Sequence, residues 1–179
     1  MEKSALRAAA RARRDAFVAT APNRAPAPDD RFRARLFPGA VVASYAPAGS
    51  EADPAALEAA ARAAGCRIAL PHVVDRATPL RFLLWDGDPL AAGPFGLRNP
   101  HPHWEEAAPD IVLTPLLAFD AALNRLGQGA GHYDRAFAAH PAAWRIGVAW
   151  SVQAVAALPF EPWDMPLNEI VTETGWVPA

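Results

Sequence analysis

The chain has 179 residues, a formal net charge of −2 and a single cysteine, Cys66. This length indicates one domain, residues 1–179, that buries a full core without disulfides, and the charge balance argues against nucleic acid as the main partner. One cysteine excludes an internal disulfide and a CxxC metal site. Charged residues crowd positions 2–15, where a signal peptide needs an apolar run, and no run of about 20 apolar residues occurs. We therefore expect a cytoplasmic protein that does not act at a membrane.

The first predicted element is a helix over residues 2–19. Leu6, Ala10 and Phe17 share one face of it and form an apolar stripe. The basic positions form a second stripe beside the first: Lys3, Arg7, Arg11 and Arg14. Two interpretations remain open, a solvated basic face and a basic edge along the rim of a docked helix. Lys3 is the only lysine among 17 basic residues, which suits a position that needs a compact point charge or arises by chance.

A proline-rich, linker-like segment at 20–30 leads into the first predicted strand, "VVASY" (41–45). A helix follows, with Asp53 as its N-cap, proline at its first position and Gly65 as its stop. The segment "RIALP" (67–71) is the next predicted strand. Together these segments predict a βαβ unit with a parallel strand pair.

The rest of the chain continues this alternation. Further strands are predicted at 80–85, 110–115, 144–150 and 168–173, and helices from about Tyr133 to before Pro141 and at 152–158. Strands that alternate with helices predict an α/β layer architecture with a mainly parallel sheet. In such sheets, ligands gather in the loops that follow the carboxyl ends of the strands.

The loop after the strand at 110–115 contains "NRLGQGAGHYDRAF" (124–137), with glycine at every second position from Gly127 to Gly131. Glycines let a ligand approach the backbone, and the following helix N-terminus offers free N–H groups to an anion such as phosphate. The G-x-G-x-G pattern is neither the dinucleotide fingerprint nor a P-loop. A flexible connector, in which Asp134 only stabilises the helix start, therefore stays an alternative.

Several side chains are candidate ligands. Asp134 and Asp164 suit Mg²⁺ beside bound phosphates, although Asp164 also fits an ordinary turn aspartate. Glu51 is either a ligand carboxylate or a solvated loop charge. His101 and His103 form a metal-binding pair that lacks a third nearby ligand. No Ser-His-Asp or Cys-His arrangement supports a covalent mechanism.

The glycine segment resembles the G-x-R-L-G-x-G-x-G-Y-Y-D signature of 5-formyltetrahydrofolate cyclo-ligases, also called methenyltetrahydrofolate synthetases. Lys3 and Arg7 match the opening K-x-x-x-R of that family. Similar matches follow in the family's order: "YAPAGSE", "LPHV", "GPFGLRNP", "DIVLTPLLAFD" and Gln153 to Glu173. The resemblance covers nearly the whole chain.

The resemblance implies a three-layer α/β sandwich with a mainly parallel central sheet, similar to the sugar-phosphate isomerase and CoA-transferase group. It also implies a monomeric enzyme whose partners are small molecules, not nucleic acid or membranes. The implied reaction consumes ATP, requires Mg²⁺ and converts 5-formyltetrahydrofolate to 5,10-methenyltetrahydrofolate. The formyl oxygen is phosphorylated and N10 closes the ring, releasing ADP and phosphate.

The resemblance assigns residues to roles. Those implied in catalysis are Lys3, Arg7 and Arg125. ATP is implied to contact these three and Leu126, Gly127, Gln128, Gly129, Ala130, Gly131, His132 and Tyr133. The folate is implied to contact Ala46, Glu51, Gln128, Gly129, Ala130, Gly131 and His132. The implied Mg²⁺ ligands are Asp134 and Asp164.

The chain departs from the family pattern at several positions. His132 stands in place of the first signature tyrosine, Ala130 in place of a common glycine and Ala46 in place of a leucine. Asn99 and Asn168 replace frequent carboxylates. Two alternatives remain: a paralogue that keeps the ATP site but acts on another substrate, and a non-catalytic regulator that binds folate or nucleotide.

Overall fold

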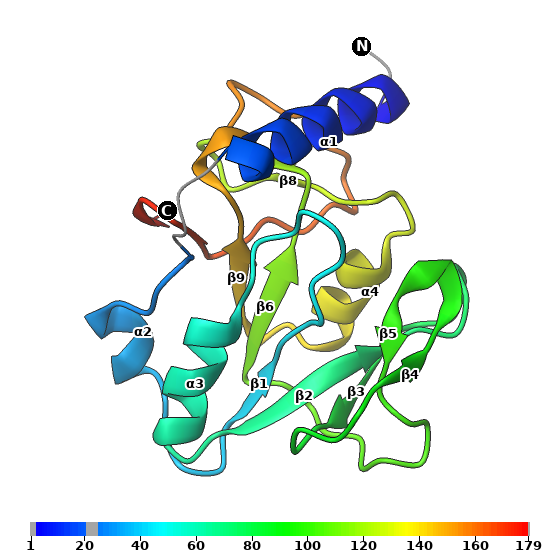
Figure 1. Ribbon diagram of the computed structural model, residues 1–179, viewed down its shortest axis with the longest axis vertical. Coiled ribbons are helices and arrows are strands. Elements are labelled where there is room, and N and C mark those ends of the chain that lie inside the picture. The colour runs from blue at the N-terminus through cyan, green and yellow to red at the C-terminus, as the bar shows by residue number, and fades with distance from the viewer. Residues whose placement is uncertain (1–2, 21–24, 179) are drawn as a thin grey trace.

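The computed structural model describes residues 3–20 and 25–178. Its centre is a seven-stranded sheet in the order β11-β10-β9-β6-β1-β2-β3 (Figure 1). The strands are β1 (Val41–Ala43), β2 (Arg67–His72), β3 (Arg81–Leu84), β6 (Ile111–Pro115), β9 (Trp144–Val148), β10 (Glu169–Thr172) and β11 (Gly175–Pro178). The α-helices are α1 (Lys3–Thr20), α2 (Asp30–Ala34), α3 (Ala55–Ala63) and α4 (His132–Ala139). The shorter elements are β4 (Ala91–Ala92), β5 (Arg98–Asn99), β7 (Ala118–Phe119), β8 (Arg125–Leu126) and the 3₁₀ turns η1 (Pro94–Gly96) and η2 (Ser151–Gln153).

The five central strands run parallel and the two edge strands, β3 and β11, run antiparallel to their neighbours. The central strands are buried apolar runs such as β6, as expected for parallel strands covered on both faces. Val41 pairs with Arg67, which confirms the predicted parallel pair of the βαβ unit. The mainly parallel sheet predicted from the alternation of elements is therefore confirmed.

Helices cover both faces of the sheet and make three layers. Phe32 of α2 and Leu57 of α3 pack with Val42 on one face. Phe137 of α4 packs with Val112 on the opposite face. The three-layer sandwich expected for the chain is confirmed. Within the described segments, no helix combines the length and apolar character that a bilayer crossing needs.

The order of the strands creates a crevice. The chain moves from β1 to β2 on one side, whereas β6 lies on the other side of β1. The loops that follow β1 and β6 therefore meet at the carboxyl edge of the sheet, where open α/β folds bind ligands. Helix α1 lies across this edge and packs against η2 (Figure 1).

The helix predicted at 152–158 is wrong. The structure has only the turn η2, after which Ala154 is extended and forms an isolated bridge with Phe119. The Val155 N–H donates to the Phe119 carbonyl at 2.8 Å, and Gln153 Nε2 donates to the Leu116 carbonyl at 2.6 Å. These tertiary hydrogen bonds overrode the local helical pattern.

Other boundaries agree within a few residues. Pro54 rather than Asp53 precedes the first residue of α3, but Asp53 Oδ1 still accepts a hydrogen bond from Ala55 N at 2.9 Å. The start of the first predicted helix at residue 2 lies outside the described residues, as do residues 21–24 of the proline-rich segment.

Gly147 of β9 allows close packing at the sheet face, and Gly147→Ala tests this. A Cβ there would lie 2.7 Å from Leu167 Cδ1 and 2.8 Å from Leu116 Cδ2. Overpacking of this kind costs about 1–3 kcal/mol, so thermal unfolding should shift down by roughly 2–10 °C. Gly127→Ala is the control, because its Cβ would meet only Arg125 NH1 at 3.5 Å. Equal melting temperatures for the two variants would contradict this packing account.

Candidate active site

The basic edge of α1 faces the glycine segment. Arg7 Nε donates to the Gly127 carbonyl at 3.0 Å, and Arg11 NH2 donates to Gln128 Oε1 at 2.6 Å. Ala10 of the apolar stripe packs with Leu117 and Leu126 beneath the helix. The interpretation of a purely solvated basic face is therefore wrong, because these side chains bind the loop on which the helix docks.

Two glycines of this segment adopt backbone conformations that disfavour a side chain. Gly129 has φ +100°, and a Cβ on it would lie 3.1 Å from the Arg7 Cζ atom. Gly131 has φ +67° and is the left-handed N-cap of α4. Both conformations disfavour a side chain, whereas Ala130 adopts no positive φ. The bend leads into the first turn of α4, whose free N–H groups are donors for an anion.

Asp120 fixes the start of this loop. Its Oδ1 accepts hydrogen bonds from the N–H groups of Ala122 and Asn124, at 3.0 and 3.1 Å. Its Oδ2 accepts from Asn124 Nδ2 at 3.1 Å and from the Leu158 N–H at 3.0 Å. One buried carboxylate thus joins the glycine segment to the chain that follows η2.

Arg125 and Asp134 form a close ion pair beneath the loop, with Arg125 NH2 2.6 Å from Asp134 Oδ1. Arg125 is only 7% exposed and lies over the Phe137 ring, 5.0 Å from its centroid. Burial lowers the pKa of Arg125, and the Asp134 charge opposes that shift. Arg125 Nε has no hydrogen-bond partner among the described residues.

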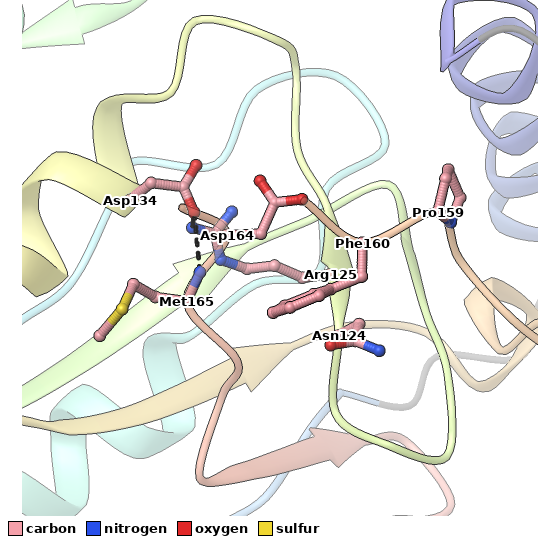
Figure 2. Close-up of a pocket in the computed structure, with 7 residues that line it drawn as sticks. All are labelled: Asn124, Arg125, Asp134, Pro159, Phe160, Asp164 and Met165. Carbon is pink, nitrogen blue, oxygen red and sulfur yellow. Dashed lines mark hydrogen bonds and ion pairs between the residues drawn. The ribbon is translucent and has the colours of Figure 1, made fainter. Parts of the chain in front are cut away.

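Lys3 reaches the second predicted metal ligand. Its Nζ lies 3.4 Å from Asp164 Oδ2 and 3.6 Å from Glu161 Oε1. Asp164 Oδ2 also accepts the Glu161 N–H at 2.9 Å. Asp164 and Asp134 line one small pocket, with Arg125 between them in the view of Figure 2. Asn124, Pro159, Phe160 and Met165 complete its lining.

The volume of the pocket and its two carboxylates fit a divalent ion. Its volume of about 10 Å³ suits one water-sized occupant. Hydrogen bonds and ion pairs within the described chain engage only Oδ1 of Asp134 and Oδ2 of Asp164. Each carboxylate therefore keeps one oxygen for a ligand. Residues 3–20 and 25–178 contain no cluster of three or more metal-ligating side chains. Two carboxylates are what Mg²⁺ ordinarily takes when phosphates and waters supply the rest.

Glu51 lies in the loop after β1, where it meets both α1 and the glycine segment. Its Oε2 accepts the Ala48 N–H at 3.0 Å, and its Oε1 lies 4.0 Å from Arg14 NH1. Burial raises the pKa of Glu51, while the Ala48 N–H and the Arg14 charge oppose the rise. Ala46, half-buried, lies in the same loop. Burial also raises the pKa of the Tyr133 hydroxyl, on which the Glu51 charge acts.

The three candidate histidines, His132, His101 and His103, contact protein groups. His132 Nε2 is 2.8 Å from the Asp75 carbonyl, so its ring ties the start of α4 to the loop after β2. The rings of His101 and His103 lie 5.5 Å apart, and the His101 ring also contacts Trp104. Within the described part of the protein, no third metal-ligating side chain joins them. A metal site at these two histidines is therefore not supported.

Sequence reasoning gave no role to two residues that shape the site, Arg14 and Asp120. Arg14 belongs to the basic stripe, but its burial depends on distant partners. Asp120 had a local signal, because an aspartate shortly before Asn124 in a loop favours a side-chain-capped turn.

Comparison with known proteins shows the family of the chain. The model of the 5-formyltetrahydrofolate cyclo-ligase family matches residues 2–173. The chain belongs to this family. It is therefore a ligase, and the predicted family and enzyme class are confirmed.

Relatives within the cyclo-ligase family include the 5-formyltetrahydrofolate cyclo-ligase of Mycolicibacterium smegmatis, 35% identical over 144 residues, which are 75% of this chain and 74% of that protein. The cyclo-ligase of Haemophilus influenzae is 38% identical over 51% of this chain and 53% of that protein. The solved 5,10-methenyltetrahydrofolate synthetase of Aquifex aeolicus has 25% identity and a TM-score of 0.65, over 99% of this chain and 84% of that one. A synthetase from Mycoplasma pneumoniae, 21% identical with a TM-score of 0.67 over 97% and 99% of the chains, shares the fold.

Proposed function

We propose that this cyclo-ligase family member converts 5-formyltetrahydrofolate to 5,10-methenyltetrahydrofolate, consuming ATP in the presence of Mg²⁺. The observation that carries the proposal is the docking of α1 on the glycine segment, with the Arg7 Nε 3.0 Å from the Gly127 carbonyl. This contact puts a basic helix edge, a bend of backbone N–H groups and two carboxylates around one edge of the sheet. Such a set of groups suits a nucleoside triphosphate.

The triphosphate is proposed to lie between α1 and the loop from Arg125 to Tyr133. Arg7 engages a carbonyl there, so a phosphate oxygen would replace that acceptor with a charged one and gain a stronger hydrogen bond. Lys3, at the end of the basic edge, supplies a compact charge near Asp164. The N-terminal turn of α4 adds backbone donors.

Asp134 and Asp164 are the proposed ligands of Mg²⁺. When bound, the ion neutralises charge on the transferring phosphoryl group. Arg125 and Lys3 form ion pairs with these carboxylates, at 2.6 and 3.4 Å. Arg125 also fixes the Asp134 rotamer. We therefore propose that Arg125 orients this metal ligand and supports the phosphate loop.

The folate is proposed to lie against Ala46, Glu51 and the glycine segment. The formyl group of the substrate is an amide, and its oxygen is a poor leaving group. Transfer of the γ-phosphoryl group to that oxygen releases ADP. Nitrogen N10 then bonds to the formyl carbon, the carbon–oxygen bond breaks, phosphate departs and the N10 proton is lost to solvent.

These steps require positioning and charge neutralisation more than a protein nucleophile. That requirement fits the residue types of the site. Cys66 lies at the opposite, amino end of the sheet, directly before β2. Its thiol is buried and lies 3.4 Å from the Phe37 carbonyl.

The test follows the ultraviolet absorbance of the methenyl product with purified protein, ATP, Mg²⁺ and 5-formyltetrahydrofolate. The proposal expects product only when all three small molecules are present. ATP hydrolysis that depends on a different substrate would support the paralogue alternative. Binding of folate and ATP without turnover would support a non-catalytic regulator.

A further inference from the structure

Arg14 differs from the other members of the basic edge of α1 because it is buried, at 4% exposure. Its Nε donates to Ser50 Oγ at 2.9 Å, and its NH1 donates to the Leu116 carbonyl at 3.4 Å. The same NH1 lies 4.0 Å from Glu51 Oε1. One guanidinium therefore joins α1 to the loops that follow β1 and β6.

Ser50 and Glu51 belong to a loop held mainly by partners outside it. Ser50 Oγ donates to the Asp15 carboxylate of α1, and the Ser50 carbonyl accepts from Trp150 Nε1 at 2.9 Å. Within the loop, the Ala48 N–H donates to the Glu51 carboxylate and the Glu51 N–H donates to the Ala48 carbonyl, at 3.0 and 3.2 Å. Removing Arg14 would release the hydroxyl of Ser50 from one of its two side-chain partners and leave Glu51 without its buried cation.

The Arg14–Glu51 ion pair by itself adds little to stability. An ion pair 4.0 Å long and largely removed from water regains little of its desolvation cost. The groups that face Glu51 come from each element packed on it: Arg11 and Arg14 of α1, Tyr45 beyond β1, Gln128 of the glycine segment and Tyr133 of α4. Of the two arginines, Arg14 acts on the Glu51 carboxyl more strongly than Arg11.

We propose that Arg14 is a positioning residue for the folate substrate: it fixes the loop 48–51 and the Glu51 carboxylate, so that docking of α1 completes the folate side of the site as well as the nucleotide side. The inference rests on the proposed function, in which Glu51 contacts the folate. Because the Arg14 charge favours the ionised form of Glu51, its loss raises the pKa of that carboxyl further. The acid limb of the activity profile then moves to higher pH.

The experiment compares Arg14→Met with Arg13→Met, a control at the exposed neighbouring position of the same helix. Equilibrium affinity for 5-formyltetrahydrofolate is measured by fluorescence titration, and KM is measured separately for folate and ATP. Arg14→Met should weaken folate binding about tenfold and change the KM for ATP less than about twofold. Arg14→Lys should recover part of the loss, and Arg13→Met should match the unmodified protein.

Glu51→Gln distinguishes the possible failures. If Glu51→Gln weakens folate binding but Arg14→Met does not, the role of Arg14 is overturned and the proposed function stands. If Glu51→Gln also leaves folate affinity unchanged, the folate contact of the proposed function fails, and the role of Arg14 fails with it. Equal losses for folate and ATP in Arg14→Met would show a general effect on helix docking and overturn the inference.

Ser50→Ala keeps the test decisive if Arg14→Met does not fold. It removes only the hydroxyl that Arg14 and Asp15 hold, so it should weaken folate binding about threefold with unchanged KM for ATP. Unchanged folate affinity in folded Ser50→Ala would then overturn the inference.

Discussion

Asp134→Asn should lower kcat by about a hundredfold or more and raise the Mg²⁺ concentration needed for half-maximal rate. The amide keeps the size of the side chain but loses the charge that holds both Arg125 and the proposed ion. The ion pair with Arg125, 2.6 Å long and nearly buried, is lost at the same time. Leaving that guanidinium unpaired should destabilise the fold by about 3 kcal/mol.

Asp164→Asn separates the two effects. It leaves the Arg125–Asp134 pair intact, so it should shift the Mg²⁺ requirement with little change in melting temperature. Glu161→Gln in the same loop is the matched control, because Glu161 contacts Lys3 but is not a proposed metal ligand. Binding of Mn²⁺ with ATP, followed by electron paramagnetic resonance, gives a readout independent of turnover. Unaltered metal titrations in both aspartate variants would reject metal ligation by this pair.

Lys3→Ala should lower kcat/KM for ATP by about a hundredfold while leaving the fold intact. The contacts of Lys3 with Asp164 and Glu161 are partly exposed ion pairs, which contribute about 0–1 kcal/mol each to stability. The melting temperature should therefore change little. The affinity of Asp164 for a metal ion should not fall, because the variant removes a competing cation.

Arg13→Ala is the control for Lys3→Ala, since it removes an exposed cation from the same helix. It tests whether net positive charge on α1 is sufficient to attract the nucleotide. Unchanged kinetics in Lys3→Ala would reject a phosphate contact for Lys3, and equal losses in both variants would indicate only a long-range effect of charge.

Much of the fold could be predicted because its signals are local. The apolar run of β6 and the proline and glycine boundaries of α3 are properties of short segments. The turn η2 was mistaken for a helix since its conformation depends on the Phe119 and Leu116 carbonyls, far away in sequence. A single sequence shows periodicity but not the tertiary hydrogen bonds that override it.

In the site, too, local patterns could be predicted and long-range contacts could not. The glycine segment suited a phosphate loop or a flexible connector. The basic stripe of α1 suited a solvated face or the rim of a docked helix. Only the structure decides between them, because Arg7 and Gly127 are 120 residues apart. Arg14 could not be assigned at all, since its acceptors at Ser50 and Leu116 are 36 and 102 residues away. No spacing rule relates residues across such distances.

The central claim is that the phosphates of ATP lie between α1 and the glycine segment, and amide NMR spectra test it most directly. Glycine resonances lie in a separate region of such spectra. Addition of MgATP should shift the amides of Gly127, Gly129 and Gly131, and AMP, which lacks the β and γ phosphates, should shift them much less. If MgATP leaves these three amides unchanged and instead shifts Gly93 and Gly96 near η1, the nucleotide binds elsewhere and the account is wrong.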